Sequence, residues 1–203
     1  MAYPTVDGPY GFQPINLIGG QVFAGATRMI PIASGSGTSI FAGDVVRLNT
    51  GGTLSRVSST DSATDAVGIF MGCQFTNPTT KQLLQQQYYP ASTVASDIVG
   101  FVADDPDTYF KVAVLSNSTT IGGMTQTDIG NNVAILVTAG STTTGDSKEG
   151  VSATTGTTTT LPFRVIAGVP ETVNASGSFT EVIVKWNMGV HTYYSSAAVA
   201  TAA

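Results

Sequence analysis

The sequence predicts an almost all-β protein with a sandwich or barrel core and an extended N-terminal arm. Short apolar runs alternate with Gly, Ser, Asn and Asp turns at a spacing of roughly 8–12 residues, which is typical of sandwiches and barrels. No segment shows a strong helical period of apolar residues. The 203 residues are 42% hydrophobic, enough to fill the core of one large domain or two small ones.

Residues 1–20 are expected to form the arm. Three prolines and four glycines in this segment prevent a helix and disfavour a central strand. The segment also carries large apolar side chains that must be buried somewhere: Tyr10, Phe12, Ile15, Leu17 and Ile18. They pack either on their own domain or on a neighbouring chain, and in an assembly protein the second choice makes them interface residues.

Residues 21–75 are predicted to form a first β region. Turn sequences such as Ser-Gly-Ser-Gly at 34–37 and Asn-Thr-Gly-Gly at 49–52 separate its apolar runs. The candidate strands are 21–23, 28–32, 44–48, 53–57 and 66–75.

Residues 76–97 interrupt this rhythm and are predicted to be a connecting loop between two β regions. The stretch 79–87 suits a short helix or a polar loop, and Pro90 would stop a helix that ran past Tyr88 and Tyr89. The two tyrosines are candidate interface residues, because tyrosine is enriched at protein interfaces.

Residues 98–194 are predicted to form a second β region, and 195–203 a flexible tail of small residues. One or two further strands are expected within the Thr-rich stretch 138–160, around a loop at 140–148. The clearest candidate strands are 98–103, 109–115, 133–137, 161–168 and 181–186. The sequence leaves open whether residues 1–97 and 98–194 are two domains or one interleaved fold.

Charged residues make up only 10% of the chain, against roughly 25% in an ordinary soluble domain. The net charge is −5 and the eight basic residues are scattered, whereas a nucleic-acid-binding protein needs a basic patch. A catalytic surface usually needs a cluster of ionisable groups. The composition therefore favours a binding or building protein over an enzyme, and excludes nucleic acid as an expected partner.

The chain has one cysteine and one histidine, Cys73 and His191, which lie far apart in the sequence. A single cysteine excludes an internal disulfide, and Cys73 is expected to be a small buried residue in a strand. A zinc site needs three or four ligands, so none is predicted. There is no G-x-S-x-G motif that would mark a nucleophilic serine, and His191 is expected at a surface or an interface.

The acidic turn Asp104-Asp105-Pro106-Asp107 offers hard oxygen atoms but lacks the spacing and the glycine of an EF-hand, so a capped turn is expected. A carboxylate pair for glycoside hydrolysis would have formal candidates, but no spacing singles out two of them: Asp44, Asp104, Asp105, Asp107, Glu171 and Glu181. We therefore predict no catalytic residue, no cofactor and no metal.

The N-terminus lacks the basic and apolar regions of a signal peptide, and no apolar run approaches the about 18 residues of a membrane-spanning helix. We expect synthesis in a cytoplasm and no membrane partner. Tyr193 and Tyr194, like the tyrosine pair at 88–89, could stack on sugars. A subunit interface or the edge of the core is the simpler expectation for both pairs, and a carbohydrate-binding role remains an alternative.

Three groups of motifs in the chain carry a family resemblance. The first is Asp-Gly-Pro-Tyr-Gly-Phe-Gln-Pro-Ile-Asn-Leu-Ile-Gly-Gly at 7–20 with Thr-Arg-Met-Ile-Pro-Ile at 27–32. The second is Ile-Phe-Ala-Gly-Asp-Val-Val-Arg-Leu at 40–48 with Val-Gly-Ile-Phe-Met-Gly-Cys at 67–73. The third is 102–112 with Ile-Gly-Asn-Asn at 129–132 and Leu-Pro-Phe-Arg-Val-Ile at 161–166. Together these motifs resemble small capsid-associated proteins of tailed bacteriophages from marine and fresh water.

The resemblance implies a non-enzymatic decoration, or cement, protein that binds the outside of an expanded capsid and stabilises it. Such proteins often form trimers around a β-barrel or β-tulip core, although dimers exist. The implied partners are the major capsid protein and further copies of the chain, with a trimer favoured over a dimer. The implied location is the outer surface of the virion, after synthesis in the host cytoplasm. Alternatives are another head or tail component, a carbohydrate-binding module displayed on the virion, and a glycan-degrading enzyme.

Overall fold

The protein is built almost entirely from β-strands, as the sequence predicts. The computed structural model describes residues 6, 8–58 and 66–194. Strands account for 45% of the chain, and the described residues contain no α-helix. Their only helical turns are two short 3₁₀ segments, η2 (Gln126–Asp128) and η3 (Pro170–Thr172). The expectation of an all-β barrel or sandwich fold is confirmed.

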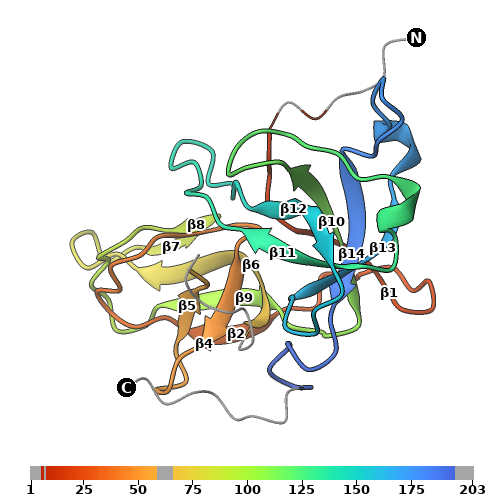
Figure 1. Cartoon of the computed structure of the whole chain (residues 1–203). Helices are drawn as coiled ribbons and strands as arrows, with labels where there is room; N and C mark the ends of the chain where they lie inside the picture. The colour runs from red at the N-terminus through yellow and green to blue at the C-terminus, as the bar shows by residue number, and fades with distance from the viewer. Residues whose placement is uncertain (1–5, 7, 59–65, 195–203) are drawn as a thin grey trace.

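A closed five-strand barrel forms one lobe, on the right of Figure 1. Its strand order is β10–β12–β11–β13–β14, and β14 pairs again with β10 to close the ring. An additional strand, β1, pairs antiparallel with β10 from outside the ring. The bounds are β1 (Gln13–Leu17), β10 (Thr108–Leu115), β11 (Asn132–Leu136), β12 (Gly150–Gly156), β13 (Phe163–Gly168) and β14 (Glu181–Trp186).

A second sheet forms the other lobe, with the order β2–β9–β6–β4–β5 and with β7 paired to the far end of β6. A short two-stranded pair, β3 and β8, lies beside it. The bounds are β2 (Arg28–Pro31), β3 (Ile40–Phe41), β4 (Val45–Leu48), β5 (Leu54–Arg56), β6 (Ala66–Thr76), β7 (Leu83–Gln86), β8 (Tyr88–Tyr89) and β9 (Val99–Ala103).

The second sheet is buried on both faces, because successive residues of a strand point to opposite sides. Val45 and Ile69 join the same hydrophobic cluster as the barrel residues, whereas their neighbours Val46 and Phe70 join a second cluster on the other face. The barrel and the sheet therefore share one core, and the chain is one interleaved fold.

The structure departs from the predicted division of the chain at three places. β9 was predicted within the second β region, 98–194, but pairs in the sheet of residues 28–103, and β1, predicted within the arm, pairs with the barrel strand β10. Residues 76–97 are more than a loop, since they contain β7 and β8. The stretch around Leu84 is a strand because alternate residues are turned inward and Leu84 packs on the second core. The predicted tail 195–203 lies outside the described residues.

The predicted arm is an integral part of the barrel from residue 11 onward. Phe12 is 1% exposed, stacks on Phe163 with ring centroids 4.7 Å apart, and meets the edge of Phe110. Gly11 has a φ of +83°, and a Cβ there would lie 2.8 Å from the backbone oxygen of Gly43. Only glycine suits this close crossing. The expectation that Phe12 faces another chain is wrong, because its ring is needed to fill the barrel core.

Replacing Phe12 with alanine is expected to lower the free energy of unfolding by about 3–5 kcal/mol, because it leaves a cavity beside the two aromatic rings of Phe110 and Phe163. Ile18 is 45% exposed and provides the matched control, since Ile18→Ala should change stability by less than about 0.5 kcal/mol. Denaturant titration measures both. A loss below about 1 kcal/mol for Phe12→Ala would contradict the packing described for β1.

Candidate functional site

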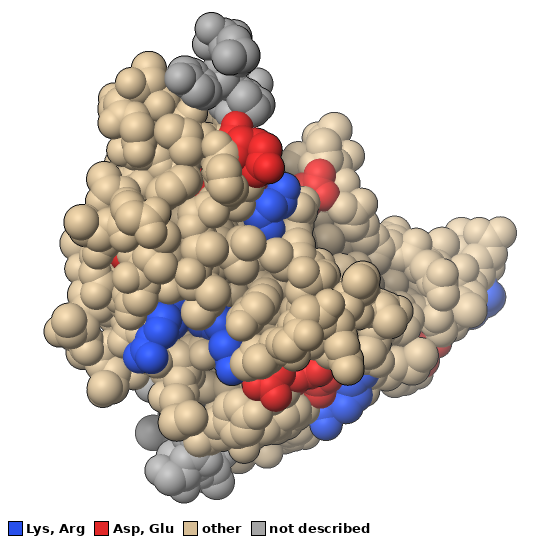
Figure 2. Space-filling model, turned by 90° about the vertical axis from the view of Figure 1, so that its right-hand side faces the viewer, with Lys and Arg blue, Asp and Glu red and all other residues tan. Residues whose placement is uncertain are grey.

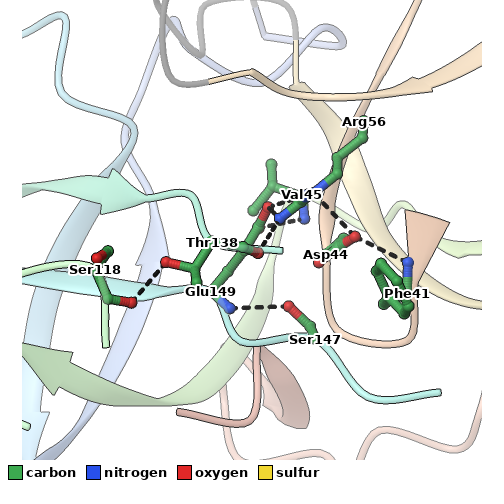
Figure 3. Close-up of polar contacts among 8 residues, drawn as sticks. All are labelled: Phe41, Asp44, Val45, Arg56, Ser118, Thr138, Ser147 and Glu149. Carbon is green, nitrogen blue, oxygen red and sulfur yellow. Dashed lines mark hydrogen bonds and ion pairs between the residues drawn. The ribbon is translucent and has the colours of Figure 1, made fainter. Parts of the chain in front are cut away.

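A buried ionic cluster joins the sheet to the barrel, and Figure 3 shows its geometry. Arg56 at the end of β5 reaches two carboxylates that are 0% exposed, Asp44 and Glu149. Its Nε lies 3.0 Å from Asp44 Oδ2 and also 3.0 Å from Glu149 Oε1. Its Nη2 lies 3.0 Å from the same glutamate oxygen. One guanidinium group therefore serves two buried acids.

Backbone groups from both lobes complete this cluster. The Val45 N–H donates to Glu149 Oε2 at 2.9 Å, and Arg56 Nη2 donates to the backbone oxygen of Thr138. The Phe41 N–H donates to Asp44 Oδ2 at 2.8 Å. Glu149 and Thr138 belong to the barrel side of the chain, just before β12 and just after β11, whereas the other groups belong to the sheet. The cluster thus fixes how the two lobes meet.

Burial is the main reason why the pKa values of both acids are raised. For Glu149 the neighbouring Asp44 charge adds to the rise, and Arg56 opposes it. For Asp44 the opposing groups are Arg56, the Ser147 hydroxyl and the Phe41 N–H. Two carboxylates close together in a dry interior favour the binding of a proton. Neither acid is exposed to solvent, so this cluster acts on stability rather than on a substrate.

The acidic turn and the C-terminal tyrosine pair, which the sequence suggested separately, lie together. Tyr193 donates its hydroxyl to Asp104 Oδ2 at 2.6 Å, and the Tyr194 hydroxyl lies 3.5 Å from Asp107 Oδ2. Two cations neutralise the same acids: Arg28 lies 2.8 Å from Asp104, and Lys185 lies 3.2 Å from Asp107. The turn is thus held by phenol and cation partners.

This surface also includes the tip of the β1 hairpin. The Ile18 N–H donates to the backbone oxygen of Asp107 at 3.1 Å, and the guanidinium of Arg28 lies over the Tyr193 ring. Ile18, Tyr193 and Tyr194 are each 44–48% exposed. We call these three residues the contact patch. They were among the candidate interface residues, and the structure brings them to one place.

The other candidate interface residues are partly or fully covered by the chain itself. Tyr10 is half-buried, and its hydroxyl donates to Glu181; burial, with this carboxylate, raises the pKa of Tyr10 well above its ordinary value. Tyr88 is half-buried and stacks on Phe41. Tyr89 is 0% exposed, so its assignment to an interface is wrong, because its ring fills the second core. Ile15 and Leu17 are half-buried on β1.

His191 is fully buried, although the sequence placed it at a surface or interface. Its ring lies 5.3 Å from that of Trp186, and its Nδ1 accepts the N–H of Tyr193 at 3.2 Å. Burial lowers the pKa of His191 to about 4, so the side chain is neutral at pH 7. Cys73 is buried in a strand as expected, and burial raises the pKa of its thiol to about 12. Neither residue is placed to act on a substrate.

No group of three or more His, Cys, Asp or Glu side chains within the described ranges could hold a metal ion. Of the formal carboxylate candidates, Asp44 lies in the buried cluster, Asp104 and Asp107 in the neutralised turn, and Glu181 beside Tyr10 and Lys111. Glu149 and Arg56 were not among the predicted site residues. The only feature of the sequence that could have indicated them is the scarcity of charged residues, since each charge in so uncharged a chain needs a partner when it is buried.

The stability of the protein is expected to depend on pH through Glu149. Its raised pKa means that the folded state retains a proton that the unfolded chain releases above pH 4.5, so stability falls as pH rises from there toward the folded pKa. Glu149→Gln should remove this dependence, so its stability relative to wild type should increase with pH. Urea titration from pH 5 upward measures the difference. Glu171→Gln, at an exposed position, is the control, and equal slopes in all three proteins would contradict the assignment.

His191 is expected to act in the opposite direction and at lower pH. Its folded pKa of about 4 lies below the ordinary 6.5, so the unfolded chain binds a proton in this interval that the folded state rejects. Wild type should lose about 3 kcal/mol relative to His191→Gln as pH falls from 6.5 to 4. Thermal or urea unfolding across this interval tests the effect, and parallel curves for the two proteins would refute it.

Comparison with known proteins gave no relative. No family model matches the chain, and neither do any curated protein or solved structure. No helix in the described part of the chain is long and apolar enough to cross a membrane.

Proposed function

We propose that this chain is a virion structural protein that decorates and stabilises the outer surface of an expanded phage capsid. In this proposal it binds the major capsid protein, associates with further copies of itself as a homotrimer, and catalyses no reaction. The motifs at 7–32, 40–73 and 102–166 that resemble capsid-associated proteins support the proposal. The all-β barrel architecture is compatible with the folds that the resemblance implies.

The observation that carries the proposal furthest is the low and neutralised charge of the surface. Figure 2 shows one face on which charged side chains are few and separated by large uncharged areas, with red and blue groups often adjacent. The pairs Arg28–Asp104 and Lys185–Asp107 are examples. Such a surface can pack against a shell without burying many unpaired ions, which would cost several kcal/mol each.

The contact patch is the favoured site of attachment. Its aromatic and aliphatic side chains are about half-exposed, and the acids beside them are already neutralised by Arg28 and Lys185. Tyrosine and isoleucine can therefore be desolvated here at little electrostatic cost. The shared core and the buried cluster keep the patch, which draws on residues far apart in the sequence, in one arrangement.

Co-sedimentation with expanded empty capsids of the encoding phage tests this proposal, with light scattering to measure the oligomer. Deleting residues 2–20 would be a poor test, because it removes Phe12 from the core. The sharper variant is Ile18→Asp with Tyr194→Asp, which places two charges in the contact patch. We expect it to reduce capsid occupancy about tenfold or more while the fold is retained, since each 1.4 kcal/mol of lost binding energy is a factor of about ten.

Val94→Asp is the matched control, because Val94 is 65% exposed and follows β8 in the sheet lobe. It should leave capsid binding unchanged. A wild-type protein that remains monomeric and does not sediment with capsids would overturn the proposal. Binding to a glycan array under the same conditions would then favour a carbohydrate-binding module.

A further inference from the structure

Arg164 occupies an unusual position on the outer wall of the barrel. It lies on β13 between Phe163 and Val165, both of which point into the core, so its own side chain points outward and is exposed. Arg28 and Arg56, by contrast, face carboxylates. Arg164 forms no ion pair with any carboxylate in the described part of the chain, and its neighbours are amides.

Two buried asparagines hold the guanidinium in place. Arg164 Nε donates to Asn132 Oδ1 at 3.0 Å, and Nη2 donates to Asn187 Oδ1 at 3.3 Å. The two asparagines are 3% and 5% exposed. Their own amide N–H groups donate to the backbone oxygens of the turn before β13, at Thr158, Thr159 and Leu161. The oxygens of both amides are therefore fixed toward Arg164.

This arrangement leaves much of the arginine available for a ligand. A guanidinium has five N–H groups, of which these two bonds use two. The side chain borders a hollow of about 250 Å³, whose other lining residues offer amide, hydroxyl and backbone groups: Gly130, Asn131, Asn132, Gly156 and Thr157. Asp128 is the acid nearest in sequence to the lining residues 130–132, and its carboxylate accepts hydrogen bonds from Thr125 and Thr155.

The charge next to this hollow also points to an anion. Arg164 and Lys185 are directly opposite each other on the antiparallel pair β13–β14, a position in which like charges repel. Lys185 is paired with Asp107, so the three groups together carry one positive charge. That charge matches a carboxylate, which is planar and singly charged, better than a doubly charged phosphate.

We propose that Arg164 and the adjacent hollow form a carboxylate-binding site. The guanidinium binds the planar carboxylate through N–H groups that Asn132 and Asn187 leave free, and it supplies the one net positive charge beside the hollow. Thr157 and Asn131 provide polar groups around the remainder of the ligand. The ligand class is an organic carboxylate, whether a simple acid or a sugar acid. This site is separate from the contact patch and does not depend on the capsid proposal.

Amide NMR spectra of the full chain test the site, recorded during titration with sodium acetate and, separately, sodium glucuronate up to about 100 mM, with sodium chloride matching the ionic strength. Saturable shifts at Asn132, Gly156 and Thr157 are expected. Equal affinities would indicate recognition of the carboxylate alone, and tighter glucuronate binding would indicate added contacts to the sugar hydroxyls. No shift at these residues with either ligand would overturn the proposal.

Arg164→Gln should weaken binding at least tenfold, and Arg164→Lys, which keeps the charge but loses the planar fork, should weaken it severalfold. The lysine variant keeps the test valid if the glutamine variant fails to fold. Lys148→Gln, at an exposed position on the loop before β12, is the control and should bind as wild type does. Shifts that persist unchanged in Arg164→Lys, or larger shifts with inorganic phosphate than with acetate, would contradict the assignment.

Discussion

The arrangement of the whole molecule depends on Arg56 and the two acids that it joins. Burying an ion costs several kcal/mol, and the cost is offset only when the geometry satisfies each charged atom. Here Arg56 and the Val45 N–H supply that geometry for Glu149, across the boundary between sheet and barrel. A shift of one lobe against the other would leave carboxylates buried without partners. The cluster therefore fixes one relative position of the two lobes. Hydrophobic packing alone would tolerate more variation in that position.

Local signals predicted most of the longer strands, and long-range pairing explains most of what they missed. The predicted strand 21–23 is wrong, since Val22 forms only an isolated bridge with Asn16. β14 coincides with the predicted 181–186, because alternating residues are bounded by polar turns on both sides. β9 was assigned to the wrong region because the residue types at 98–103 do not indicate which strands they pair with, and the partners are β2 and β6. The same holds for β1, whose pairing with β10 spans about half of the chain. The two-residue strands β3 and β8 are too short to have a period at all.

The candidate sites also contain both residues that local sequence features indicated and residues that only long-range contacts reveal. Tyr193 and Tyr194 were predicted as interface residues and the acidic turn as a capped turn, and the structure adds that the tyrosines contact the turn. By contrast, Glu149 lies in a Thr- and Gly-rich stretch and Arg56 in an ordinary strand, so no spacing marks them as partners. The core role of Phe12 was hidden for a related reason. The prolines and glycines around it indicate an extended backbone, but burial depends on Phe163, which comes much later in the chain.

Because the chain has few charged residues, the structure assigns a distinct role to most of its cations. Arg56 holds the lobes together, Arg28 and Lys185 neutralise Asp104 and Asp107 at the surface, and Lys111 pairs with the buried Glu181. These pairs leave a surface on which shape and apolar contacts, more than long-range attraction, decide what binds. Arg164 differs, because two buried amides orient it and no acid of the described chain neutralises it. Holding a cation rigidly in a polar hollow reduces the entropy lost when an anion binds, so its positioning favours recognition over a purely structural role.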